Sequence, residues 1–217
     1  MTNYCILGDA GSGKDTVGKM VAEILGKETY ALAAPIKDLV AALFGLTEET
    51  MNGRAYKEKK TFLKVTPRSL KAAGEVYKSH GLWEYQDFPD AWQQWIDDLG
   101  LTLEPWGHYE GWYSPRDMFQ YIGTEWGRGI DDEIWIKKAP DNVVVTDVRL
   151  YNEADFFFNK GWEFIHVVRP NVEKIEGSGH ITEQGVNHPL IVPITIRNDG
   201  GIRDLGEKVE TLLRIYK

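Results

Sequence analysis

The sequence predicts an α/β fold, a three-layer sandwich with a central parallel sheet and a helical insertion. Short apolar runs alternate along the chain with segments whose apolar residues recur at helical spacing. Strands interleaved with helices are typical of parallel sheets built from right-handed βαβ units. Most of the apolar runs are continuous rather than alternating, as expected for strands that are covered on both faces.

The elements follow from these runs in chain order. The expected strands are residues 3–7, 29–33, 142–146, 163–168 and 192–196, and the expected helices are 14–25, 36–44, 115–127, 153–159 and 204–215. Ligands bind at the carboxyl ends of the strands in such sheets. The segments that follow strands are therefore the first places to look for a site.

Composition narrows the class of protein. The chain has 217 residues, 42% of them apolar, and a formal net charge of −8. This acidity argues against a protein that coats nucleic acid, which needs a positive surface, while a local basic pocket can still bind a small anion. Cys5 is the only cysteine, so no internal disulfide forms. No apolar run is long enough to cross a bilayer. We expect a cytoplasmic protein that binds neither nucleic acid nor membranes, with a homodimer among the open subunit arrangements.

The first strand leads directly into a glycine-rich loop. Residues 8–16 read Gly-Asp-Ala-Gly-Ser-Gly-Lys-Asp-Thr, and a helical pattern follows at once. Strand, loop and helix together are the context of a phosphate-binding P-loop, because backbone N–H groups and the positive helix N-terminus both attract phosphates. The residues expected to bind a nucleoside triphosphate are Gly11, Ser12, Gly13, Lys14, Asp15 and Thr16, with Lys14 on the β- and γ-phosphates. A glycine-rich turn before an ordinary helix is the alternative.

The residue after the lysine departs from the usual P-loop pattern. This position is normally Ser or Thr, whose hydroxyl binds Mg²⁺, but here it is Asp15, followed by Thr16. A carboxylate beside polyphosphate is repelled unless a metal ion or a water lies between them. Either Asp15 holds Mg²⁺, directly or through water, or Thr16 supplies the hydroxyl.

Residues 47–113 are expected to form a helical, tryptophan-rich insertion within a single domain of residues 1–217. The segment shows no convincing core strand and begins with a basic stretch. It carries Trp83, Trp92, Trp95, Trp106 and Trp112 out of eight tryptophans in the chain. We interpret these tryptophans as a small local core rather than as a surface for base stacking.

A second candidate site lies on the helix that Ser114 and Pro115 begin as N-cap and first residue. Arg116, Gln120 and Thr124 are four residues apart and share one stripe of this helix. An arginine, an amide and a hydroxyl in line can hold a phosphate and the polar edge of a ring. A solvated polar face is the alternative, but Gly123, which costs about 1 kcal/mol inside a helix, favours a functional stripe.

A third candidate site follows the strand at 142–146. This strand delivers Asp147 and Arg149 to its carboxyl end, and Glu153 lies in the first turn of the next helix. In P-loop proteins an acidic residue at this place commonly helps to hold Mg²⁺ or a substrate, and an arginine can bind a phosphate through two N–H groups. A capping aspartate and a surface arginine are the alternative.

Two loops carry weaker signals. Residues 180–184 read His-Ile-Thr-Glu-Gln and are either a lid or a plain surface loop, and the turn at 198–201 either frames a base or simply caps the last helix.

Taken together, these segments resemble the bacteriophage deoxynucleoside monophosphate kinases. The resemblance rests on residues 8–16, 33–38, 114–128, 146–154 and 180–184, and the most specific part reads Pro-Arg-x-x-x-Gln-x-x-Gly-Thr-Glu-Trp-Gly-Arg from Pro115 to Arg128. Residues 47–113 show no such likeness. A lysine followed by aspartate in the P-loop is normal in this family.

The resemblance implies a P-loop kinase fold and transfer of the ATP γ-phosphate to a deoxynucleoside monophosphate (dNMP), with Mg²⁺. It implies dNMP contacts for Arg116, Gln120, Gly123, Thr124, Trp135, Asp147, Arg149 and Glu153, and ATP or metal contacts for Lys14, Asp15 and Thr16. Asp117 occupies a position that is basic in relatives, so Arg128 or Lys37 is expected to supply the missing catalytic cation. The alternatives are another small-molecule P-loop kinase, of the phosphomevalonate or dephospho-coenzyme A type, and a non-catalytic nucleotide-binding protein, which Asp15 favours.

Overall fold

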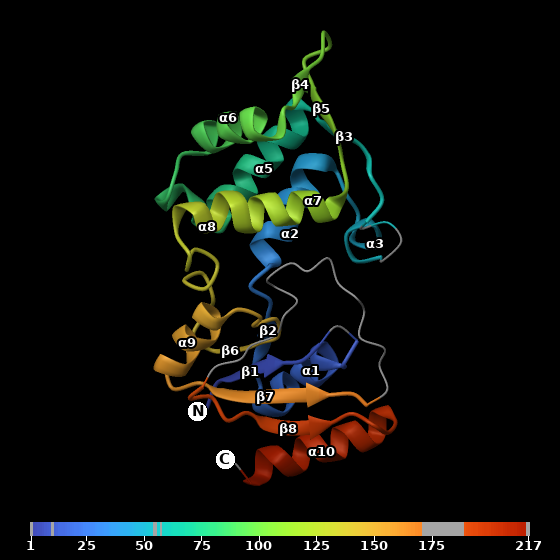
Figure 1. Cartoon of the computed structure of the whole chain (residues 1–217), viewed down its shortest axis with the longest axis vertical. Helices are drawn as coiled ribbons and strands as arrows, with labels where there is room; N and C mark the ends of the chain where they lie inside the picture. Colours follow the sequence, from blue (N-terminus) through green and yellow to red (C-terminus); the bar gives the residue numbers. More distant parts are fainter. Residues whose placement is uncertain (1, 10, 54–55, 57, 171–188, 216–217) are drawn as a thin grey trace. The chain divides into compact units, whose positions relative to one another are not determined.

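A computed structural model describes residues 2–9, 11–53, 56, 58–170 and 189–215 (Figure 1). The chain forms two compact units, each with its own hydrophobic core. Unit 1 comprises Met1–Leu32 and Ala139–Lys217, and unit 2 comprises Ala33–Lys138. The segment predicted as an insertion, residues 47–113, is therefore only part of unit 2.

Unit 1 is built around a five-stranded parallel sheet with the strand order β2-β6-β1-β7-β8. Its elements are β1 (Tyr4–Leu7), α1 (Lys14–Leu25), β2 (Glu28–Tyr30), β6 (Val143–Val145), α9 (Tyr151–Asn159), β7 (Glu163–Val168), β8 (Ile194–Arg197) and α10 (Ile202–Ile215). The chain runs from β1 toward one edge of the sheet and later from β6 toward the other. The carboxyl end of β1 thus lies at a topological switch point, where ligands bind in such sheets.

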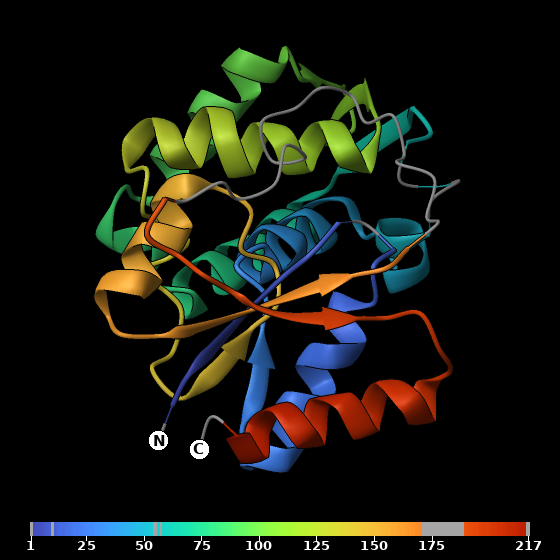
Figure 2. The same ribbon diagram turned by 60° about the horizontal axis from the view of Figure 1, so that its bottom comes forward.

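Helices cover both faces of this sheet. On one face, α1 and α10 pack over the strands (Figure 2), with a core that includes Ile6, Val17, Val21 and Val209, each fully buried. Right-handed crossovers that run in opposite directions place α9 on the other face, where Phe157 is buried against Trp162 at a ring distance of 4.7 Å. The predicted α/β class with a central parallel sheet is confirmed.

Several predicted bounds were shifted. Helix α1 and strand β7 have the predicted limits, but β2 ends at Tyr30 because Ala33 already caps α2, which begins at Ala34 and has Pro35 in its first turn. Proline fits there because the first helical N–H groups need no intrahelical partner.

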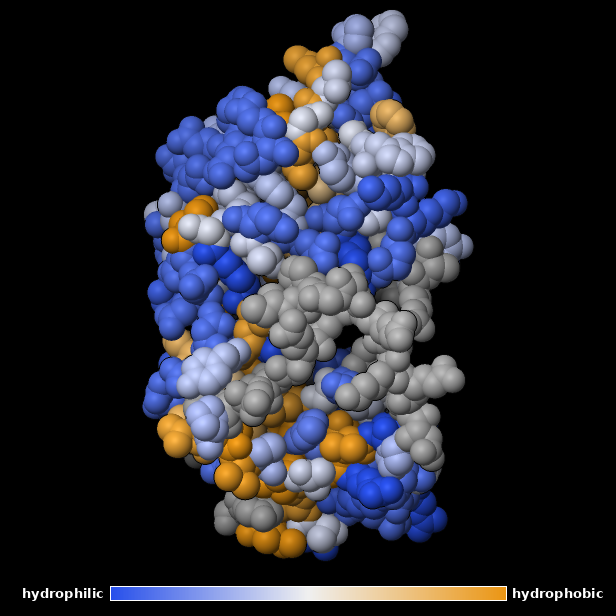
Figure 3. Space-filling model, in the orientation of Figure 1, coloured by the Kyte–Doolittle hydropathy of each residue, from blue (hydrophilic) through white to orange (hydrophobic). Residues whose placement is uncertain are grey.

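On the face drawn in Figure 3, apolar surface gathers over the part of unit 1 that contains β7 and β8.

Unit 2 combines helices with a second sheet. Its elements are α2 (Ala34–Phe44), α3 (Glu48–Asn52), β3 (Thr61–Val65), α5 (Pro67–Ser79), η1 (Leu82–Glu84), α6 (Phe88–Leu99), β4 (Thr102–Leu103), β5 (Tyr109–Tyr113), α7 (Pro115–Gln120), η2 (Tyr121–Trp126) and α8 (Gly127–Ile130). The strands form an antiparallel sheet in the order β3-β5-β4.

The expectation that residues 47–113 contain no strand was wrong. In β3, Leu63 and Val65 are buried while Phe62 and Lys64 are exposed, which is the alternation of a strand with one covered face. The lysines that surround it concealed this short pattern.

The tryptophans of residues 47–113 divide into two groups. Trp92 and Trp95 are buried in the core of unit 2, where Trp95 packs edge-on against Trp126 at a ring distance of 5.0 Å. Trp83, Trp106 and Trp112 are exposed. The interpretation as a local core is therefore right for the first group only.

Across the described ranges, no helix is long and apolar enough to span a bilayer.

Candidate functional site

The glycine-rich loop joins β1 to α1 in a conformation that only glycine adopts readily. Gly8, Gly11 and Gly13 have φ angles of 152°, 80° and 93°, in the region that side chains with a Cβ disfavour. Gly13 is the N-cap of α1 and offers no side chain to its first N–H groups. The N-terminus of α1 is thus available to an anion, as in a P-loop.

The charged residues of this loop differ in exposure. The Lys14 side chain is 12% exposed and its Nζ lies 3.6 Å from Oδ1 of Asp15, whose side chain is 72% exposed. Thr16 is partly buried. The structure therefore places the lysine against the protein and the aspartate toward solvent.

Ser12 is the most buried of the described residues in this loop. It is 3% exposed, and its hydroxyl has no hydrogen-bond partner within the described residues. Its carbonyl accepts a hydrogen bond of 2.8 Å from Nδ2 of Asn198, in the turn that follows β8. Sequence reasoning missed this contact because the two residues are 186 positions apart. The only available signal was a polar residue directly after a strand.

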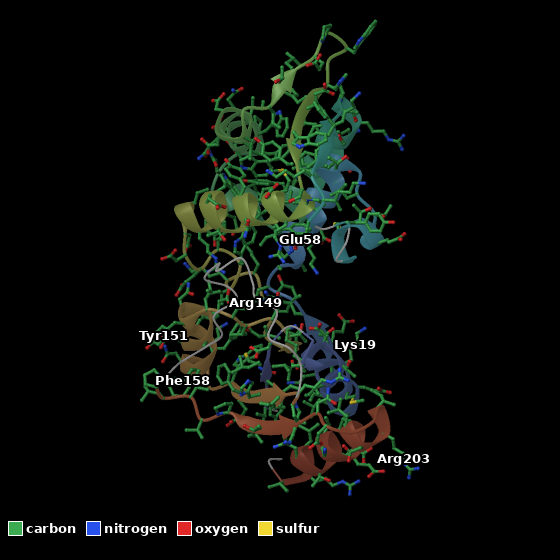
Figure 4. All side chains as sticks on the ribbon, turned by 45° about the vertical axis from the view of Figure 1, so that its right-hand side comes forward. Lys19, Glu58, Arg149, Tyr151, Phe158 and Arg203 are labelled. Carbon is green, nitrogen blue, oxygen red and sulfur yellow. The ribbon has the colours of Figure 1, made fainter. Side chains whose placement is uncertain are left out.

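The carboxyl end of β6, the neighbour of β1, carries the next group. Oδ1 of Asp147 accepts a hydrogen bond of 2.6 Å from the Leu32 N–H. Glu153 is 3% exposed, and its carboxylate accepts from the N–H groups of Arg149 and Leu150 at 2.7 and 3.0 Å. This is the capping arrangement of α9. Glu153 thus shapes the turn that presents the exposed Arg149 (Figure 4).

The same carboxylates affect Cys5 on β1. Burial raises the pKa of the Cys5 thiol well above its ordinary value, and the negative charges of Asp147 and Glu153 raise it further. Cys5 therefore stays a neutral thiol and behaves as a small core residue.

In unit 2 the predicted polar stripe lies on a continuous but irregular helix. Arg116, Gln120 and Thr124 are partly exposed, while Met118 and Ile122 are 0% and 1% exposed. The helix predicted at 115–127 is present, but it is not α-helical throughout, because α7 passes into the π-helical η2 and then into α8. Short π-helical segments are frequent at functional sites.

Arg116 already has a partner in this unit. Its Nε lies 2.5 Å from Oε1 of Glu58, whose side chain is 51% exposed. Any anion that binds Arg116 must therefore share or replace this carboxylate.

The surroundings of Gly123 and Trp135 give each residue a role in packing. A Cβ on Gly123 would lie 2.9 Å from Cδ1 of Ile36 on α2, so the glycine lets two helices approach. The Gly123 carbonyl accepts a 2.7 Å hydrogen bond from Nε1 of Trp135, which is 1% exposed. In this structure both residues belong to the core of unit 2 and stand behind the polar stripe rather than on an open surface.

The remaining residues of unit 2 that the sequence singled out each have different neighbours. Asp117 accepts a hydrogen bond of 2.8 Å from the Ser114 N–H and closes the capping box of α7, which explains an acidic residue there. Arg128 lies in α8, with Nη1 3.4 Å from the Asp132 carbonyl, and Lys37 is partly buried in the first turn of α2. Residues 180–184 lie outside the described residues.

The structure thus gathers the predicted residues into two groups. In unit 1, the glycine-rich loop and the group formed by Asp147, Arg149 and Glu153 follow adjacent strands, β1 and β6. In unit 2, the stripe from Arg116 to Thr124 lies on one helix, with Trp135 bonded to its backbone.

The chain is similar to several known proteins. A family model described as deoxynucleotide monophosphate kinase matches residues 106–209. The chain is 29% identical to the deoxynucleoside-5′-monophosphate kinase of Escherichia phage T5, over 91% of this chain and 90% of that protein. It is 26% identical to the deoxynucleotide monophosphate kinase of Enterobacteria phage T4, over 94% and 95% of the two chains. An unliganded sugar kinase from Janibacter sp. HTCC2649 aligns with 99% of this chain and 95% of its own, at 14% identity and a TM-score of 0.39.

Proposed function

The chain belongs to the deoxynucleotide monophosphate kinase family, and we propose that it transfers the γ-phosphate of ATP to a dNMP, giving ADP and the diphosphate. The observation that carries this proposal is the pairing of two anion-binding features on adjacent strands. A helix N-terminus that has no side-chain cap follows β1 together with Lys14, and a turn that presents Arg149 follows β6. A protein that only sensed ATP would need no second anion site.

ATP binds, in this proposal, through the backbone of Gly11, Ser12 and Gly13 and through Lys14. The transferred phosphoryl group carries spread negative charge in the transition state, so catalysis is largely positioning and electrostatic stabilisation. Lys14 supplies charge to the β- and γ-phosphates. Arg128 and Lys37 are the proposed sources of the second catalytic cation.

The oxygen donors at the start of α1 fit Mg²⁺, which prefers hard oxygen ligands and keeps several waters beside substrate phosphates. The Thr16 hydroxyl is the proposed direct ligand. Asp15 is the proposed outer ligand, because its carboxylate is largely exposed. When bound, Mg²⁺ neutralises phosphate charge during transfer.

In unit 1, Asp147 and Arg149 are the proposed acceptor contacts. In unit 2, the stripe of Arg116, Gln120 and Thr124 is proposed, on its own unit, as a surface for a phosphate and the polar edge of a base. Gly123, Trp135 and Glu153 are buried, so we propose that they hold the acceptor-binding helix and turn in place.

The experiment is a coupled assay of ADP release with dNMPs, the matching NMPs, mevalonate phosphate and dephospho-coenzyme A. We expect turnover with dNMPs. The kcat/KM for dGMP should exceed that for GMP by about tenfold or more, because burying a 2′-hydroxyl without a partner costs about 1–3 kcal/mol, which corresponds to roughly 5- to 150-fold. Turnover with mevalonate phosphate or dephospho-coenzyme A alone would identify another small-molecule kinase. ATP binding without turnover of any acceptor would identify a nucleotide-binding protein.

A further inference from the structure

The turn after β8 lies against the glycine-rich loop through one side chain. Asn198 is 9% exposed, and its Nδ2 lies 2.8 Å from the Ser12 carbonyl oxygen. A carbonyl oxygen can only accept, so the amide NH₂ group must face it. The backbone N–H of Asn198 donates to the Val168 carbonyl at 2.8 Å, which fixes the residue to the end of β7.

This contact orients a peptide plane. The structure contains no cis peptide bond among the described residues, so the Ser12 carbonyl and the Gly13 N–H point in opposite directions. Holding the carbonyl toward Asn198 therefore turns the Gly13 N–H away from it. In a P-loop these backbone N–H groups are the ones that bind phosphate.

Gly13 is matched to this side chain. Its φ of 93° already favours glycine, and a Cβ there would lie only 2.5 Å from Nδ2 of Asn198. The close approach of amide and loop thus requires both residues.

The turn that carries Asn198 is held on both sides. Nζ of Lys208 on α10 binds the Arg197 carbonyl at 3.0 Å and Oδ1 of Asp199 at 2.7 Å. The hydrogen bond from Lys208 is the main reason that the pKa of Asp199 lies below its ordinary value. Asn198 is consequently presented from a fixed turn rather than from a loose loop.

We propose that Asn198 is a positioning residue of the phosphate-binding loop, which orients the Ser12–Gly13 peptide and so sets the affinity for the nucleotide phosphates. This inference rests on the proposed function only in that the loop binds the phosphates of ATP or ADP.

The test is Asn198→Asp, which keeps the shape of the side chain and removes the donor. Calorimetric titration of the full chain with Mg·ADP should show binding weakened by about tenfold or more, equal to about 1.4 kcal/mol. The KM for dNMP should stay within about twofold of wild type, a margin of about 0.4 kcal/mol. Lowering the pH should restore part of the ADP affinity, because a protonated carboxyl regains an O–H donor.

Arg203→Ala is the matched control, because Arg203 lies on α10 with a 92% exposed side chain and pairs only with Glu207 in the described ion pairs. It should leave ADP binding unchanged. Thermal unfolding checks that each variant is folded, and Asn198→Ala serves if the aspartate variant is not.

Wild-type ADP affinity in a folded Asn198→Asp or Asn198→Ala variant would overturn the inference, as would equal weakening of ADP binding and dNMP use. Since ADP binding needs no acceptor, the inference and the proposed function fail separately. A wild type that phosphorylates no dNMP, but whose ADP binding depends on Asn198, refutes only the proposed function.

Discussion

The ammonium group of Lys14 lies 3.6 Å from Oδ1 of Asp15, at the first turn of α1. The two side chains are sequence neighbours, and the carboxylate is 72% exposed. The lysine side chain is only 12% exposed, but an ion pair whose carboxylate is open to water contributes little to stability. The lysine can therefore exchange this partner for a phosphate, and the two residues can be tested independently.

Lys14→Ala should reduce phosphoryl transfer to less than about a tenth of wild-type turnover, because one cation on the transferring phosphates is worth roughly 10³-fold or more. Steady-state rates with saturating ATP and dNMP measure this. Lys19→Ala is the control, since Lys19 is an exposed lysine on the same helix (Figure 4). Near-normal turnover of the Lys14 variant would remove this residue from the phosphate site.

Asp15→Asn separates the two roles of the unusual P-loop position. If Asp15 helps to hold Mg²⁺, the variant needs a higher Mg²⁺ concentration for half-maximal rate, because a carboxylate is a stronger ligand for the ion or its waters than an amide. A Mg²⁺ titration of the initial rate at fixed ATP measures this. An unchanged titration with tighter ATP binding would mean that the carboxylate only repels phosphate.

Arg149→Ala and Arg116→Ala should each lower kcat/KM for dNMP by roughly 10- to 150-fold, the equivalent of about 1.5–3 kcal/mol for a charge-assisted hydrogen bond. ATP binding should change much less. Arg203→Ala again serves as the arginine control. Loss of ATP affinity with an unchanged KM for dNMP would show that these arginines serve the donor nucleotide instead.

Trp135→Phe should destabilise the protein by about 1–3 kcal/mol, because the buried Gly123 carbonyl loses its donor. Thermal or denaturant unfolding measures the change. Trp112→Phe, the same substitution at a side chain that is 56% exposed, should stay within about 0.5 kcal/mol of wild type. Equal effects of the two substitutions would contradict a structural role for the indole N–H.

Asp131→Asn should lower the stability at neutral pH and have no effect in strong acid. A hydrogen bond from Lys137 is the main cause that holds the pKa of Asp131 below its ordinary value of 3.8. An Asp with a lowered folded pKa stabilises the fold above its unfolded pKa, and this contribution disappears as the pH falls below 3.8 and through the folded pKa. Unfolding curves of both proteins from pH 7 to about pH 2 should converge at the acid end.

Sequence periodicity predicted unit 1 well because its elements bury continuous apolar runs or regular stripes. Helix α1 and strand β7 have the predicted limits. The three-stranded sheet of unit 2 was not predicted, since β4 has only two residues and lysines surround β3. Short strands of this kind owe their conformation to partners far away in the sequence.

The candidate site likewise has a part that the sequence predicts and a part that it does not. The glycines of the P-loop could be predicted, because a positive φ demands that residue type. The contact of Asn198 with Ser12 could not, because it joins positions 186 residues apart. Burial of Trp135 and the capping role of Glu153 also depend on packing that a spacing argument does not contain.

The division of the chain into units has a consequence for its synthesis. Unit 2 is one uninterrupted segment, Ala33–Lys138, while unit 1 is assembled from both ends of the chain. Domains fold as units while the ribosome adds about 5–20 residues per second. All of unit 2 has therefore been made before β6, β7 and β8 exist, and the glycine-rich loop is translated well before Asn198, whose side chain binds the Ser12 carbonyl.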